Sequence, residues 1–162
     1  MSHYAVLVIH EKDQSVDKLL APYEEKPDNP NSKWDWYDAE GGRFQEDMMI
    51  DGKYVTTGKI SDIEFLPDKY IYNEAVAAWR ENRGNVRDKF LSEIDYVRFA
   101  TEFYTFAVVT PDGEWHAPGN VLWFGMNDAP EEAMDYWRKY YREEFIDKYK
   151  KGYYCTLVDC HI

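Results

Sequence analysis

Residues 4–10 form an unbroken apolar and β-branched run, Tyr-Ala-Val-Leu-Val-Ile-His. Such a run is typical of a central strand that is covered on both faces. Residues 153–161 predict a final strand at the other end of the chain. Any fold for this sequence must therefore bury its first strand inside a sheet and pair its last strand with another strand.

The segments between these strands predict further elements from their turn and cap signals. They are a helix capped by Ser15 and running to Tyr23, a loop at 24–33, a tight turn at 50–53, helices at 68–82 and 85–102, strands at 104–109 and 114–116, and a helix that begins after Asp128 and stops at Gly152. With the middle left out, the order is strand, helix, strands, helix, strand. That is the order of an α+β, ferredoxin-like split βαβ sandwich.

In that layout the first and last strands are antiparallel neighbours, so His3 and His161 are expected to lie close together at one end of the sheet. The length of 162 residues predicts a single domain, 1–162. Its core strands are expected near 4–10, 104–117 and 153–161, with a helical insertion at about 68–102.

Two helix details are specific enough to compare with the structure. The helix at 85–102 is expected to turn Phe90, Ile94 and Val97 inward, because these residues share one stripe. Asp128 is expected to be the N-cap of the last helix, with Glu131 three residues later as in a capping box.

The charge balance narrows the range of partners. The chain has 31 acidic and 19 basic residues, a formal net charge of −12. Direct binding of nucleic acid is disfavoured, because it relies on Lys and Arg at the phosphates, and an anionic membrane is disfavoured for the same reason. Such a field attracts a basic protein surface. The alternative is that the acidic residues only keep an aromatic-rich protein in solution.

The cysteines and the N-terminal segment predict a cytoplasmic protein. Cys155 and Cys160 fall in one predicted strand, so a disulfide between them is not expected. The apolar run at 5–9 has no basic segment before it and is too short for a signal peptide, and no stretch approaches the ~20 apolar residues of a membrane span.

The chain lacks the common catalytic motifs: there is no phosphate-binding loop, dinucleotide fingerprint, nucleophile elbow, zinc-protease motif or CxxC. The sequence therefore predicts no catalytic residue, no metal and no cofactor, and it leaves open whether the protein is an enzyme.

The most concentrated group of candidate binding residues combines aromatic rings, carboxylates, a glycine pair and an arginine. It consists of Trp34, Asp35, Trp36, Tyr37, Gly41, Gly42 and Arg43. The glycines permit positive φ or the close approach of a ligand, Arg43 can bind an anion, and a tryptophan can stack on a ring. A nucleotide-like ligand would fit these groups. The alternative is a structural corner in which Arg43 pairs with a nearby carboxylate.

Three smaller candidates complete the set. His3, Asp159 and His161, if the end strands pair, offer two imidazoles and a carboxylate for a metal or for acid–base work; the alternative is two solvent-facing chain-end histidines. Trp115 and His116 follow a turn, either as a pH-sensitive contact or as ordinary hairpin side chains. Tyr136 and Tyr140 lie beside the apolar stripe of the last helix and are expected either to pack or to remain exposed as contact residues.

Several stretches of the chain carry a family resemblance. They are 1–9 with 20–23, 29–37 with 41–44, 111–116 with 123–125, and 158–162. Together they resemble an uncharacterised bacteriophage and prophage protein family, which is in turn distantly similar to the ferredoxin-like domain of Api92-like mobile-element proteins. The resemblance covers most of the chain. It implies a phage or mobile-element protein in a bacterial cytoplasm and supports the ferredoxin-like core, but it supplies no catalytic residue.

These observations lead to three hypotheses. The first is an acidic phage protein that binds and inhibits a host or defence protein, in a counter-defence, anti-CRISPR-like role. The second is a small-ligand binder or hydrolase built on the loop with Trp34, Trp36 and Arg43. The third is a phage accessory protein that self-associates as a homo-oligomer through Tyr136 and Tyr140.

Overall fold

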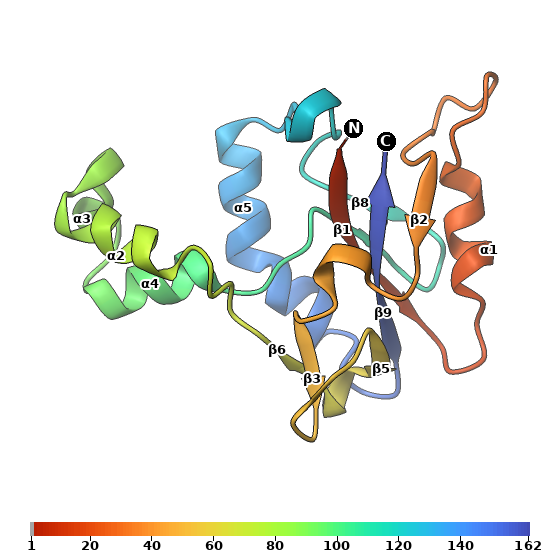
Figure 1. Ribbon diagram of the computed structural model, residues 1–162, viewed down its shortest axis with the longest axis horizontal. Coiled ribbons are helices and arrows are strands. Elements are labelled where there is room, and N and C mark those ends of the chain that lie inside the picture. Colours follow the sequence, from red (N-terminus) through yellow and green to blue (C-terminus); the bar gives the residue numbers. More distant parts are fainter. Residues whose placement is uncertain (1) are drawn as a thin grey trace. The chain divides into compact units, whose positions relative to one another are not determined.

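A computed structural model describes residues 2–162, so Met1 lies outside the described part of the chain. The chain divides into two compact units, and each is described by itself. The first contains the residues up to Glu64 and from Tyr104 to Ile162, and the second is Phe65–Phe103. The protein is a mixed α+β protein (Figure 1).

The strands are short except at the two ends of the chain. They are β1 (His3–His10), β2 (Trp36–Asp38), β3 (Met48–Ile50), β4 (Lys53–Tyr54), β5 (Thr57–Lys59), β6 (Glu64–Phe65), β7 (Ala107–Val109), β8 (Trp115–His116) and β9 (Tyr154–His161). The main sheet has the order β2-β9-β1-β7-β8, and β5 also pairs with β9. β3 and β4 form the hairpin expected around residues 50–53.

The expected pairing of the first and last strands is confirmed. β1 and β9 are antiparallel along their whole length, from His3 opposite His161 to His10 opposite Tyr154. The ferredoxin-like order is not confirmed. A split βαβ unit places another strand between its two parallel strands, whereas β7 is the direct, parallel neighbour of β1. The result is a mixed sheet.

Helices cover both faces of this sheet, α1 (Val16–Leu20) on one side and α5 (Glu131–Tyr141) on the other (Figure 1). Side chains alternate along β1, so Val6 and Val8 join the cluster that holds Leu20, whereas Leu7 and Ile9 point to the opposite face. This double burial explains why the sequence of β1 is apolar without alternation.

The remaining helical segments of this unit are short. They are 3-10 turns at Ala21–Tyr23, Gly42–Phe44, Ile60–Asp62 and Trp123–Gly125, and a π-helical segment, Arg142–Asp147, that continues α5. The Ser15 cap of α1 is confirmed, since its side chain accepts the Lys18 N–H at 3.2 Å. The Asp128 cap is wrong: α5 begins at Glu131 without a side-chain cap, because the Asp128 carboxylate accepts hydrogen bonds from Asn120 instead.

The second unit is a group of helices, α2 (Tyr72–Arg80), α3 (Val86–Lys89) and α4 (Glu93–Thr101), with a 3-10 turn at Arg83–Asn85. The single helix expected at 85–102 is therefore wrong. Phe90 takes an extended conformation, and Ser92 starts a new helix by accepting the Asp95 N–H. This break changes the helical phase, which leaves Ile94 70% exposed while Val97 is buried. No helix within residues 2–162 has the length and apolar character that a membrane crossing requires.

Candidate functional site

Two histidines meet at the end of the sheet where β1 starts and β9 ends. The backbones of Ser2 and Ile162 exchange two hydrogen bonds of 3.1 Å, so the next pair, His3 and His161, occupies a non-hydrogen-bonded position. Side chains approach most closely at such positions. The two imidazole rings lie edge to face with their centroids 5.1 Å apart. The juxtaposition expected from the sequence is confirmed.

A buried carboxylate orients the first imidazole. Asp159 is two residues before His161 and therefore on the same face of β9, and it is only 2% exposed. Its Oδ1 lies 3.0 Å from Nδ1 of His3, and its Oδ2 accepts the backbone N–H of Arg43 at 3.1 Å. These contacts partner both carboxylate oxygens inside the protein, as a buried charge requires.

The second imidazole has its own carboxylate, from the loop that leads into β2. Nδ1 of His161 lies 2.6 Å from Oδ1 of Asp35, whose backbone N–H also donates to the carbonyl of His161. His3, Asp35, Trp36 and His161 line an open hollow of about 370 Å³, which we call the histidine hollow. Trp36 is 54% exposed, so part of its ring is available to a ligand.

Only part of the predicted tryptophan-rich group belongs to this hollow. Trp34 lies in the core, where its indole N–H donates to the carbonyl of Leu20 at 3.0 Å. Tyr37 packs edge to face against Trp34, and its hydroxyl donates to Asp17. The structure therefore separates Trp34 and Tyr37 from the surface on which Trp36 is displayed. Alternation along β2 accounts for Tyr37, because adjacent side chains point to opposite faces. Trp34 precedes β2 and forms a separate bridge with Glu24, so the alternation of β2 does not govern its direction.

The glycine pair takes positive φ as expected, +85° at Gly41 and +45° at Gly42. A Cβ on Gly42 would overlap the carboxylate of Asp159, and a Cβ on Gly41 would overlap the side chain of Thr56. The Arg43 side chain is exposed, and within residues 2–162 it forms none of the expected ion pairs. Its contribution to the site is its backbone N–H. The glycines thus shape the turn that holds Asp159.

Replacing Gly42 by alanine is therefore expected to destabilise the protein more than replacing Gly52, which also has positive φ (+76°) but has nothing near its missing Cβ. Each substitution should cost about 1–2 kcal/mol for the left-handed backbone. The collision with Asp159 should add about 1–3 kcal/mol for Gly42 alone. Urea unfolding of both variants measures the difference. Equal losses would show that Asp159 moves aside freely.

Trp115 and His116 are hairpin residues away from the histidine hollow. Trp115 is half-buried against the rings of Tyr4 and Tyr23. Nε2 of His116 lies 3.0 Å from Oγ1 of Thr110, which directly follows the neighbouring strand β7, and its ring contacts Phe145. Both residues have structural partners, which favours the interpretation that they are ordinary side chains of the hairpin.

Tyr136 and Tyr140 lie on α5 with their ring centroids 4.6 Å apart. Tyr136 is exposed, and its hydroxyl donates to Glu144 at 3.1 Å, whereas Tyr140 is half-buried. The exposure of Tyr136 favours the interpretation that it is a contact residue, and the partial burial of Tyr140 favours it less.

Leu122–Met126 form an exposed turn, which we call the aromatic turn and which was not predicted from the sequence. Trp123 is 73% and Phe124 81% exposed, and Phe124 takes φ +61°, a left-handed value that is unusual for a bulky residue. The hydroxyl of Ser2 donates to the carbonyl of Leu122 and accepts the N–H of Gly125, both at 2.7 Å. A signal was present: four apolar residues, Val121 to Phe124, follow one another between Gly119 and Gly125, without helical or strand periodicity.

The aromatic turn and the histidine hollow belong to the same end of the sheet. Ser2, which holds the turn, directly precedes His3, and the turn lies beside the ends of β1 and β9 (Figure 1). Exposed carboxylates follow the turn along the chain, at Asp128, Glu131 and Glu132. This end therefore combines exposed rings with acidic side chains. We call it the acidic aromatic end.

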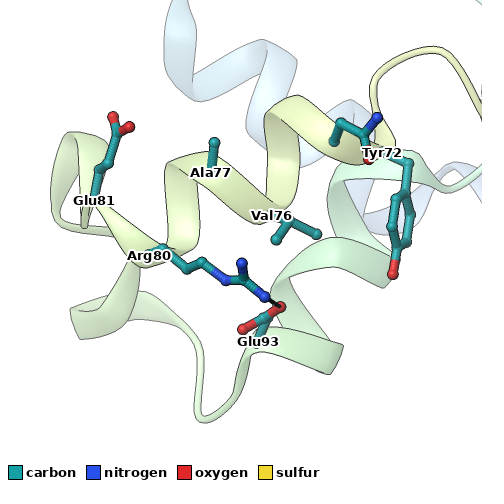
Figure 2. A pocket seen from close by; sticks show the side chains of 7 residues that line it. Tyr72, Val76, Ala77, Arg80, Glu81 and Glu93 are labelled. Atoms are coloured by element: carbon teal, nitrogen blue, oxygen red, sulfur yellow. Dashed lines mark ion pairs between the residues drawn. The ribbon is translucent and has the colours of Figure 1, made fainter.

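The second unit contains a groove of about 510 Å³ along α2 (Figure 2). Its charged groups neutralise one another, since Arg80 reaches across to Glu93 at the start of α4, with Nη2 and Oε1 3.7 Å apart. Glu81 lies beyond this pair and forms its own with Arg83. The groove therefore lacks a set of polar groups that converge on a ligand.

Within residues 2–162, no three His, Cys, Asp or Glu side chains are placed to hold a metal ion. Both cysteines are free and buried, and burial raises the pKa of each thiol, so neither resembles a reactive thiolate. Comparison of the chain with protein-family models, curated proteins and solved structures finds no significant match.

Proposed function

We propose that this protein binds a basic surface of another protein and blocks it, using the acidic aromatic end. The observation that carries the proposal is the aromatic turn, which displays Trp123, Phe124 and Met126 to solvent. Aromatic residues and methionine are enriched in protein interfaces, and the surfaces of monomeric proteins rarely expose several such residues together. A turn that holds Phe124 in a left-handed conformation costs stability, which is consistent with a functional role.

The charge of the protein indicates the chemistry of the partner. A net charge of −12 attracts a basic surface, and the exposed carboxylates beside the turn would form the polar rim of the contact. Surfaces that bind nucleic acid are strongly basic. The partner class that we favour is therefore a host or defence protein whose nucleic-acid channel is occupied by these carboxylates, a counter-defence, anti-CRISPR-like role in a bacterial cytoplasm. The family resemblance adds the phage context to this proposal.

The proposal is tested by capturing partners from a bacterial lysate with the tagged wild type, with a Trp123→Ser/Phe124→Ser variant and with Tyr136→Ala. A single basic protein should be enriched by the wild type and by Tyr136→Ala and lost with the turn variant. The purified partner should then bind the turn variant at least ~30-fold more weakly, as expected for the loss of a central aromatic contact. Raising the salt from about 0.1 M to about 1 M should release the partner, because the screening length falls to ~3 Å.

Two outcomes would contradict the proposal. Equal capture by the turn variant would remove the aromatic turn from the interface. Loss of capture with Tyr136→Ala alone would favour self-association through α5 instead, if sedimentation also shows that this substitution converts an oligomer into a monomer. Circular dichroism of each variant shows whether a loss reflects the surface or the fold.

A further inference from the structure

The histidine hollow presents hydrogen-bond acceptors. A carboxylate can only accept, so the contacts of Asp159 with His3 and of Asp35 with His161 place the ring proton of each neutral imidazole on Nδ1. Each Nε2 is then left with a lone pair. Within residues 2–162, neither Nε2 has a hydrogen-bond partner, and both side chains are partly exposed. Both rings therefore offer an unused acceptor.

The other two lining residues favour the same kind of ligand. Asp35 has a carboxylate side chain that is 39% exposed, and only its Oδ1 is engaged by His161. The Trp36 ring at the edge of the hollow has a negative face, which attracts cations. One carboxylate, two imidazole acceptors and an indole face together select a cation, and they disfavour an anion such as phosphate.

The size of the hollow and its ligand set indicate which cation. Among residues 2–162, no three His, Cys, Asp or Glu side chains converge as a metal site requires. The hollow is open and has a volume of about 370 Å³, so it also has room for a group larger than a bare ion. A planar guanidinium stacks on aromatic rings, is weakly hydrated and donates along several directions. It suits the hollow better than a compact ammonium, which is strongly hydrated.

We propose that the histidine hollow receives the guanidinium group of an arginine, with Trp36 stacking on it and Asp35 accepting its N–H groups. The inference rests on the proposed function, because it makes this arginine part of the basic surface of the partner. The histidine hollow then determines the specificity of the contact with the partner, and the aromatic turn provides the apolar part of that contact.

The test uses ethylguanidinium as the probe for the full-length protein, with acetyl-citrulline amide as a neutral mimic of the arginine side chain. NMR signals of the Trp36 indole and of the His3 and His161 rings should shift with a dissociation constant on the order of millimolar, and citrulline should cause no shift at matched concentration. Asp35→Asn should weaken the binding of ethylguanidinium roughly tenfold. Trp36→Leu should weaken this binding roughly 2–5-fold. Asp38→Asn removes a nearby charge, in β2 but outside the hollow, and should leave the affinity unchanged.

Three results would overturn the inference: equal shifts with citrulline, equal weakening by Asp38→Asn and Asp35→Asn, or saturation of the hollow by Zn²⁺ alone with no response to ethylguanidinium. The outcome is separable from that of the proposed function. A partner whose capture requires the aromatic turn but survives Asp35→Asn and Trp36→Leu would sustain the proposed function and refute the arginine site.

Discussion

Replacement of Tyr141 by alanine is expected to lower the free energy of unfolding by about 3–5 kcal/mol, the range measured for removal of large aromatic side chains from cores. Tyr141 is 1% exposed and packs against the rings of Trp137, Phe145 and Tyr104. It lies where α5 gives way to the π-helical segment, so a cavity there would loosen the helix that covers one face of the sheet. Urea denaturation measures the loss.

Tyr141→Phe is the matched control for this prediction. The phenol hydroxyl lies 2.7 Å from Oγ1 of Thr105, which also donates to the carbonyl of Ala107. Removing the hydroxyl alone should cost about 1 kcal/mol. Equal losses for the alanine and phenylalanine variants would mean that the hydrogen bond, rather than the packing of the ring, is what Tyr141 contributes.

Alkaline pH is expected to destabilise the protein through its buried thiols. Burial raises the pKa of Cys155 from 9.0 to about 12, and burial together with the charge of Asp159 raises the pKa of Cys160 in the same direction. Above pH 9 the unfolded chain releases protons that the folded chain retains, so stability falls as pH rises. From pH 9 to about pH 11 the loss should be about 2 kcal/mol for Cys155, and Cys160 should add a similar amount.

The test is a set of urea unfolding curves between neutral pH and about pH 11, for the wild type and for a Cys155→Ala/Cys160→Ala variant. The variant will differ in stability at neutral pH, so the quantity compared is the change with pH. Its alkaline loss should be smaller by about 4 kcal/mol, with the remainder due to buried tyrosines such as Tyr4, whose pKa burial also raises. Parallel pH profiles would show that the thiols do not govern alkaline unfolding.

Sequence reasoning succeeded where the signal was local or was tied to the ends of the chain. The unbroken apolar run of β1 predicted a doubly covered strand, and pairing with the last strand placed His3 beside His161. It was wrong where two local patterns competed. The apolar stripe at 85–102 predicted one helix, but Ser92 within that range caps a new helix, α4. The Asp128 carboxylate accepts a hydrogen bond from Asn120 and does not cap α5.

The candidate site was predicted in part, for a related reason. Residues two positions apart share a face only within one strand, and where β2 begins is decided by tertiary contacts that the sequence pattern does not show. Trp34 and Trp36 are equivalent by type and spacing, yet Trp34 is buried and Trp36 lines the histidine hollow. The partnership of Asp35 with His161 joins residues 126 positions apart, and nothing local indicates it.

The sequence by itself determined the central strands, the charge that disfavours nucleic acid, and the free state of two cysteines in one strand, because each follows from composition or from periodicity within a few residues. Tertiary structure alone decided the parallel pairing of β1 with β7, the break before α4, the carboxylate assigned to each histidine and the exposure of the aromatic turn. These features depend on contacts between distant segments, whose free energies are set by burial and geometry in the folded chain.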